Sequence, residues 1–186
     1  MSSCARNRSS PGARSSCRTA LSDTAAPVTV RPATVADVPQ ILAFIRGLAE
    51  YERLPDQVVA TEARLRATLF GPTPAAEVLL AYLGAEPAGF ALFFQNYSTF
   101  LARPGIYLED LFVLPEYRGR GIGKVLLRAL ARLAVERDCG RLEWSVLDWN
   151  ADAIGFYRKL GAVAMDDWTV FRLTGNALSD LAEEGF

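Results

Sequence analysis

The chain has 186 residues, of which 51% are hydrophobic and 22% are charged, and its formal net charge is −1. This length suffices for one domain with a substantial core, whereas no apolar run approaches the roughly 18–20 residues that span a membrane. We therefore expect no membrane partner, and the near-neutral charge argues against a nucleic-acid partner held through its phosphates. The sequence has no histidine and only three scattered cysteines. This excludes a Ser-His-Asp triad, a His-ligated metal and a disulfide framework, so no metal is expected and any general base is a carboxylate, Tyr, Lys, Cys or water.

Residues 1–26 differ in composition from the rest of the chain. Four arginines share this stretch with seven serines, and its first acidic residue is Asp23. Such a composition is typical of a disordered extension, of an over-called start codon or of a transit peptide. We expect a disordered extension over residues 1–26 and one domain over residues 27–186. The extension lacks the apolar segment of a secretory signal, so we expect a cytoplasmic protein. The domain has four more acidic than basic residues, which favours cationic small molecules as ligands.

The strand and helix patterns predict an α/β or α+β fold with a mixed sheet. The first half of the chain is expected to form a strand over 28–31, a helix capped by Thr34 with Asp37, a helix over 61–69, and two strands over 78–83 and 90–94 joined by a turn over 84–89. A strand over 106–113 follows, and then a glycine-rich loop over 118–123 that opens a helix. The last part is expected to form a strand over 142–147, a helix capped by Asn150 and ended by Gly161, one or two strands within 163–173, and a short last helix.

The glycine-rich loop is the strongest local signal. Gly119, Gly121 and Gly123 stand at alternate positions between an apolar strand and an amphipathic helix. Glycine lets the backbone curl so that several N–H groups face one concavity at the start of a helix, where the helix dipole also attracts an anion. Three flanking side chains add positive charge, namely Arg118, Arg120 and Lys124. The loop therefore predicts a phosphate or pyrophosphate ligand.

Two common phosphate motifs do not fit this loop. A Walker P-loop needs a wider glycine spacing and a Ser or Thr after its Lys, whereas Val125 follows Lys124 here. A dinucleotide fingerprint has the spacing Gly-x-Gly-x-x-Gly near the first strand of the chain, whereas this loop has the spacing Gly-x-Gly-x-Gly and lies deep in the chain. The remaining alternative is a glycine-rich turn with solvated arginines.

Two segments together resemble the GNAT superfamily of N-acetyltransferases. Arg118-x-x-Gly121-x-Gly123 is similar to its acetyl-CoA pyrophosphate motif, and Asn150 through Tyr157 to Gly161 is similar to its second motif. The resemblance covers residues 28 to 173. It implies a mostly antiparallel mixed sheet, flanked by helices and splayed between two parallel strands where acetyl-CoA inserts. It also implies a homodimer.

Five further segments are similar to the diamine (spermidine/spermine) and thialysine N-acetyltransferase branch of this superfamily. They are Val30–Thr34, Leu48–Glu52, Tyr107–Asp110, Tyr117–Gly119 and Asp148–Asn150. The branch implies acetyl transfer from acetyl-CoA to a primary amine of a small cationic substrate, by direct attack and without a covalent enzyme intermediate. The polyamine enzymes carry an acid and a Trp where this chain has Asn96–Phe100, a segment that is similar to the thialysine-type members. Loss of that carboxylate disfavours spermidine as the main substrate, because a long polycation needs several anionic contacts.

The resemblance assigns catalytic roles to Glu109 and Tyr157. A primary amine has a pKa of about 10, so it must lose a proton before it attacks a thioester. Glu109 is implied to accept that proton directly or through water, and the Tyr157 hydroxyl to protonate the departing CoA thiolate. A structural ion-paired acid and a core aromatic are the alternatives for these two residues.

Further site residues follow from the same resemblance. The expected acetyl-CoA ligands are Leu111, Phe112 and Val113 through their backbone, together with Arg118, Gly119, Arg120, Gly121, Ile122, Gly123, Lys124, Asn150, Ala153 and Tyr157. The expected amine ligands are Tyr51, Glu52, Ser98, Thr99, Glu109, Asp110, Glu143, Trp144 and Ser145. Two other functions remain open at this point: a non-catalytic acyl-CoA-binding sensor, and an acetyltransferase for protein lysines or N-termini.

Overall fold

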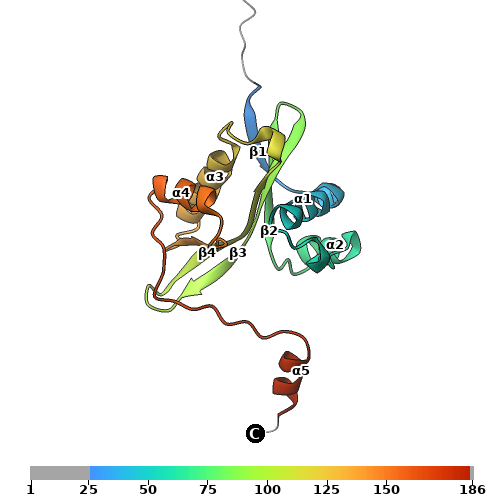
Figure 1. The fold of residues 1–186 in the computed structure, drawn as a ribbon, viewed down its shortest axis with the longest axis vertical. Coiled ribbons are helices and arrows are strands. Elements are labelled where there is room, and N and C mark those ends of the chain that lie inside the picture. Colours follow the sequence, from blue (N-terminus) through green and yellow to red (C-terminus); the bar gives the residue numbers. More distant parts are fainter. Residues whose placement is uncertain (1–25, 185–186) are drawn as a thin grey trace, which may run out of the picture.

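The core of the chain is a five-stranded sheet with the strand order β1-β2-β3-β4-β5. The structure is a computed structural model that describes residues 26–184, so the extension expected over residues 1–26 falls, except for its last residue, outside the described part (Figure 1). The strands are β1 (Val28–Pro32), β2 (Glu77–Leu83), β3 (Glu86–Ser98), β4 (Arg103–Val113) and β5 (Leu142–Trp144). Neighbouring strands are antiparallel except for the parallel pair β4 and β5. This confirms the predicted mixed, mostly antiparallel sheet.

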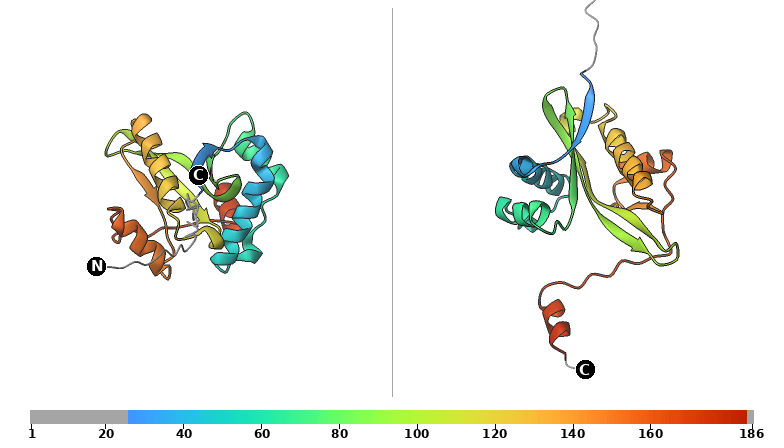
Figure 2. Two further views of the ribbon diagram at one scale, coloured as in Figure 1. Left: turned by 90° about the horizontal axis from the view of Figure 1, so that it is seen from above. Right: turned by 180° about the vertical axis from the view of Figure 1, so that it is seen from behind.

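Helices cover both faces of the sheet, and they begin where the capping residues predict. α1 (Val38–Tyr51) and α2 (Glu62–Phe70) lie on one face, and α3 (Ile122–Glu136) and α4 (Ala151–Lys159) lie on the other (Figures 1 and 2). The short helix η1 (Val35–Asp37) leads into α1, and the Asp37 carboxylate accepts hydrogen bonds from the Thr34 backbone and hydroxyl. Thr61 caps α2, and Asn150 caps α4. The two remaining short helices are η2 (Pro55–Gln57) and η3 (Pro115–Tyr117).

Each face of the sheet has its own apolar cluster. Ile122, Leu126 and Leu130 of α3 pack on strand residues such as Phe93 and Leu108. On the opposite face, the buried residues of α1 and α2 pack on Leu80, Phe90 and Phe112 among others. The central strands are covered on both sides, which explains why Val78–Ala81 is a continuous apolar run rather than an alternating one.

The sheet opens between its two parallel strands. β4 and β5 pair only from Ile106 opposite Leu142 to Leu108 opposite Trp144. β5 then ends, whereas β4 continues to Val113. The last five residues of β4 therefore have β3 on one edge and no strand on the edge toward β5. This is the splay that the resemblance implies.

Two predicted strands differ from the structure. The strand expected over 142–147 ends at Trp144. The prediction of one or two strands within 163–173 is wrong for this chain, because those residues are assigned no strand and lie exposed. A strand needs a neighbour for its backbone N–H and C=O groups, and this segment lies along no strand of its own sheet. The last helix, α5 (Asn176–Glu183), follows it. None of the helices within residues 26–184 combines the length and apolar character needed to cross a membrane.

We predict that Phe90→Ala destabilises the fold by about 3–5 kcal/mol, because it removes a large side chain from a closed site. Phe90 and Phe44 are both fully buried, and their rings stack with centroids 5.5 Å apart. The measurement is urea unfolding. Phe100→Ala is the matched control, since Phe100 is 94% exposed and its loss is expected to change stability little. Equal effects of the two substitutions would contradict this account of the core.

Candidate active site

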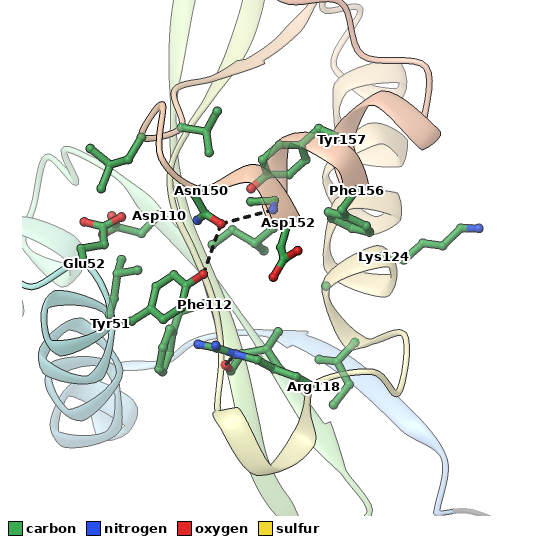
Figure 3. Close-up of a pocket in the computed structure, with 18 of the residues that line it drawn as sticks. Tyr51, Glu52, Asp110, Phe112, Arg118, Lys124, Asn150, Asp152, Phe156 and Tyr157 are labelled. Carbon is green, nitrogen blue, oxygen red and sulfur yellow. Dashed lines mark hydrogen bonds between the residues drawn. The ribbon is translucent and has the colours of Figure 1, made fainter.

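A cleft of about 500 Å³ lies where β4 and β5 part. Its walls come from the end of α1, the last residues of β4, the glycine-rich loop with the start of α3, the segment after β5, and α4 (Figure 3). These elements are far apart in the sequence but meet where the sheet opens between β4 and β5. The geometry therefore gathers most of the predicted site residues into one cavity.

The glycine-rich loop forms an open cradle at one end of the cleft. Gly119 and Gly121 have φ of 76° and 79°, a region that side chains disfavour. A Cβ at either position would meet no atom within 4 Å, so the backbone borders open space. Gly121 caps α3 without a side chain, and the helix begins with the Val125 N–H bonded to the Gly121 oxygen at 3.0 Å. The N–H groups of the three residues between them are left for a ligand.

Arg118 is held in place at the cleft wall, although its side chain is exposed. Its Nε donates to the Val113 oxygen at 3.0 Å. Its guanidinium lies 4.3 Å from the centroid of the Tyr51 ring and 5.8 Å from that of Phe112. Arg120 instead lies over Tyr117, 5.7 Å from its ring centroid, and does not line the cleft. Lys124 lines the cleft at the first turn of α3.

Two consecutive acids line the other end of the cleft. Leu92 pairs with Asp110 and Phe93 with Leu108, so Glu109 is the extra residue of a β-bulge. A bulge re-aims side chains that would otherwise alternate between the two faces. Together with the missing strand beside β4, it lets both Glu109 and Asp110 reach the cavity.

The acidic end is partly buried and crowded with negative charge. Burial, followed by repulsion from Glu109 and Glu52, raises the pKa of Asp110 to about 6. Burial also raises the pKa of Glu52, which stands beside Asp110 in Figure 3. A carboxylate in such surroundings is poised to accept a cation, which would relieve the repulsion.

Asn150 and Tyr157 lie between the two ends. The Asn150 side-chain oxygen accepts from the Ala153 N–H and from the Tyr51 hydroxyl, both at 3.2 Å, which joins α4 to the end of α1 across the cleft. Asn150 is thus a helix cap, and its amide nitrogen is left as a donor. The Tyr157 ring packs against Trp144 and Phe156, with centroids 5.0 and 5.3 Å away. Burial, and then the nearby Tyr51 and Glu52, raises the pKa of the Tyr157 phenol, so it keeps its proton at neutral pH.

The structure places four predicted amine ligands outside this cavity. The Ser98 hydroxyl is buried and accepts from the Leu101 N–H in the β3–β4 turn, and Thr99 lies in the same turn. Glu143 pairs with Arg141 and accepts a hydrogen bond from Asn96. The Trp144 ring packs against the Tyr157 ring and does not line the cleft. Ser145, by contrast, does line the cleft and is hydrogen-bonded to the Tyr107 hydroxyl at 2.7 Å.

Six lining residues were not predicted from the sequence: Leu48, Tyr117, Val146, Leu147, Asp152 and Phe156. Helical spacing could have found two of them. Asp152 and Phe156 lie four residues apart on the face of α4 that also presents Ala153. Val146 and Leu147 carry no such signal, because their place in the cleft depends on where β5 stops. Within residues 26–184, no group of three or more His, Cys, Asp or Glu side chains is arranged to hold a metal ion.

Comparison with known proteins agrees with this geometry. The family model described as "Acetyltransferase (GNAT) family" matches residues 43–162. A thialysine N-epsilon-acetyltransferase from Bos taurus is 42% identical in an alignment 166 residues long with its gaps, and the alignment covers 83% of this chain and 97% of the relative. An L-ornithine N5-acetyltransferase from Arabidopsis thaliana is 38% identical in an alignment 194 residues long with its gaps, and the alignment covers 80% of this chain and 85% of the relative. Among solved structures, an integron cassette protein from the mobile metagenome of V. cholerae matches with a TM-score of 0.73 and 27% identity, over 84% of this chain and 98% of that chain.

A sheet that opens beside a helix-end anion cradle is the arrangement that the resemblance to acetyl-CoA-dependent acetyltransferases implies. The chain belongs to the GNAT acetyltransferase family and is an acetyl-transferring enzyme. The resemblance drawn from the motifs, including the thialysine and spermidine/spermine branch, is confirmed.

We predict that Asp110→Asn stabilises the protein at pH 8 but not near pH 4. The raised pKa means that the folded chain binds this proton more tightly than the unfolded chain, so the native Asp110 opposes folding as the pH rises through about 6. The shift from 3.8 to about 6 corresponds to roughly 3 kcal/mol at pH 8. The measurement is urea unfolding at both pH values, with the exposed Asp56→Asn as control. A difference between variant and native protein that is the same at pH 4 and pH 8 would refute the burial of this charge.

Proposed function

We propose that the chain transfers the acetyl group of acetyl-CoA to a primary amine of a small cationic substrate, a thialysine-like or ornithine-like amino acid. The observation that carries this proposal is the polarity of one cleft. A cradle of N–H groups with Arg118 and Lys124 lies at one end, and Glu52, Glu109 and Asp110 lie at the other. An anionic pyrophosphate suits the first end and an ammonium group the second. Two relatives named for thialysine and ornithine acetylation support the choice of substrate class.

The residues of the cradle and of β4 bind the coenzyme in this proposal. The N–H groups at the start of α3 hold the pyrophosphate, and the exposed backbone edge from Leu111 to Val113 binds the pantetheine as an added strand would. The Asn150 amide nitrogen is placed to donate to the same arm. The acetyl thioester then lies near Tyr157, between the two charged ends. This placement supplies proximity, which accounts for much of the rate enhancement in bimolecular transfers.

The acidic end prepares the amine. Asp110 and Glu52 hold the ammonium form through their charge, and Glu109, the most exposed of the three, takes its proton directly or through one water. The free amine nitrogen attacks the thioester carbonyl carbon directly. The tetrahedral oxyanion is stabilised by backbone N–H groups near Leu111. The carbon–sulfur bond then breaks, and the Tyr157 hydroxyl gives its proton to the CoA thiolate. The nitrogen became positively charged on attack, and it gives its second proton to the Tyr157 phenolate through water, so that a neutral amide leaves and the phenol is restored. Glu109 returns its proton to solvent.

The first test is thiol release from acetyl-CoA with a panel of amines: thialysine, ornithine, lysine, putrescine, spermidine and a lysine-containing peptide. We expect turnover with the small amino acids and a higher kcat/KM for thialysine than for spermidine, because the cleft offers three clustered acids rather than a long acidic groove. Turnover with the peptide alone would favour a protein substrate. Tight acetyl-CoA binding without turnover of any amine would favour a sensor and contradict the proposal.

We predict that Glu109→Gln lowers kcat/KM by about 100-fold or more at neutral pH, the contribution expected of a general base. The deficit should shrink as the pH approaches the amine pKa of about 10, because the substrate then loses its proton unaided. Steady-state kinetics from pH 6.5 to about 9.5 measure this, with calorimetry to check that acetyl-CoA still binds. The matched control is Glu116→Gln, an exposed acid on η3 outside the cleft. A pH-independent deficit would remove Glu109 from proton transfer.

A further inference from the structure

Tyr51, the last residue of α1, contacts two other walls of the cleft. Its hydroxyl donates to the side-chain oxygen of Asn150, which caps α4, at 3.2 Å. The guanidinium carbon of Arg118 lies over its ring, 4.3 Å from the centroid, and the Trp149 ring packs against it with centroids 5.9 Å apart. One side chain thus joins α1 to the glycine-rich loop and to the segment that leads into α4.

The contact with the Tyr51 ring holds the charged end of Arg118. The hydrogen bond from Arg118 Nε to the Val113 oxygen fixes one edge of the guanidinium. The rings of Tyr51 and Phe112 lie against the group, with centroids 4.3 and 5.8 Å from its central carbon. None of the ion pairs formed within residues 26–184 includes Arg118. Its other N–H groups are therefore left for an anion, in a position that is set before the anion binds.

The Tyr51 hydroxyl in turn fixes the side-chain amide of Asn150. The Ala153 N–H donates to the Asn150 oxygen at 3.2 Å, but the amide plane can still turn about a single hydrogen bond. The Tyr51 hydroxyl is a second donor to the same oxygen, and it comes from the opposite wall of the cleft. With its oxygen occupied twice, the amide presents only its nitrogen, a donor, to a ligand.

The turn after α1 holds Tyr51 from the other side. The Leu54 N–H donates to the Ala49 oxygen at 2.8 Å, the hydrogen bond of a Schellman motif, and Arg53 occupies the position with positive φ, at 64°. Glycine is usual at that position, because side chains disfavour it. Arg53 places its guanidinium carbon 5.5 Å from the Trp149 ring centroid. The packed rings of Tyr51 and Trp149 therefore each carry an arginine, which ties the end of α1 to the cleft mouth.

Tyr51 is next to the acidic end of the cleft in sequence but not in its contacts. Glu52, the following residue, stands beside Asp110, whereas the Tyr51 ring reaches toward Arg118 and Asn150 (Figure 3). The hydroxyl proton is already donated to Asn150. These contacts lie on the coenzyme side of the cleft, although the resemblance implies that Tyr51 is an amine ligand.

We propose that Tyr51 is a positioning residue for the coenzyme. Its hydroxyl fixes the Asn150 amide for the pantetheine arm, and its ring fixes Arg118 for the pyrophosphate. The proposal rests on the proposed function, in which Arg118 and Asn150 bind coenzyme A. The two roles belong to different parts of one side chain, so different substitutions separate them.

The first test is Tyr51→Phe, which removes the hydroxyl and keeps the ring. We expect the affinity for CoA to fall by about 3- to 10-fold, the effect of one net hydrogen bond. The affinity for ADP, which has a pyrophosphate but no pantetheine, should not change. Calorimetry measures CoA binding directly and ADP binding by displacement. The KM for thialysine at saturating acetyl-CoA should also stay the same, whereas an amine ligand would raise it.

The second test is Tyr51→Leu, which removes the ring as well. We expect the affinity for ADP to fall by about threefold or more, because Arg118 loses its cation–π contact. The affinity for CoA should fall further than in Tyr51→Phe. Tyr97→Phe is the matched control, since Tyr97 is 60% exposed and lies outside the cleft; it should bind both ligands as the native chain does. Far-UV circular dichroism and thermal melting check that each variant is folded.

A double-mutant cycle shows whether the hydroxyl acts through Asn150. Adding Tyr51→Phe to Asn150→Ala should cost no further CoA affinity, because the partner of the hydroxyl is already absent. A further loss as large as that in the single variant would overturn the proposal. CoA affinity that Tyr51→Phe leaves unchanged, ADP affinity that Tyr51→Leu leaves unchanged, or a rise in the thialysine KM alone would also overturn it, with the proposed function left standing. A native chain that binds no CoA would overturn the proposed function and this proposal together.

Discussion

The loss of pairing between β4 and β5 after Leu108 and Trp144 is the constraint on which the rest of the structure depends. A parallel pair that stays closed would bury the backbone from Asp110 to Val113, and no ligand could reach it. Because β5 stops, that backbone borders a cleft of about 500 Å³, and the ends of α1, α3 and α4 converge on it. The closed part of the sheet is covered on both sides, by the apolar cluster around Phe90 on one face and by the cluster around Leu126 on the other.

The charges of the cleft are arranged along this opening. The helix-end cradle and Arg118 attract an anion, whereas Glu52, Glu109 and Asp110 repel one another in a partly buried place. This repulsion opposes folding at neutral pH by an amount that the large apolar core can offset. A cation bound here would relieve this repulsion, which is why the proposed substrate carries an ammonium group. In the proposed function, the end with the helix-end cradle binds the coenzyme and the acidic end binds the amine.

The sequence predicted those parts of the structure that depend on local chemistry. Thr34, Thr61 and Asn150 cap helices as their side chains indicate, and Gly119 and Gly121 adopt the positive φ that their spacing suggests. The sequence could not predict parts that depend on which strands meet. The shared orientation of Glu109 and Asp110 depends on a bulge against β3, and strict alternation would have separated them. Ser98 and Thr99 were placed in the site through their position in a motif, but the length of β3 carries them to the hairpin tip. The residue types at 142–147 and 163–173 favour a strand, but a segment forms a strand only where a neighbouring strand offers hydrogen-bond partners for its backbone.

The most direct test of this account is a crystal structure of the chain with CoA. The account predicts the pyrophosphate on the N–H groups between Gly119 and Lys124, the pantetheine along β4 from Leu111 to Val113, and the sulfur beside the Tyr157 hydroxyl, facing Glu109 and Asp110. A pyrophosphate bound elsewhere, or a sulfur on the far side of the cleft from Tyr157 and the acids, would contradict it.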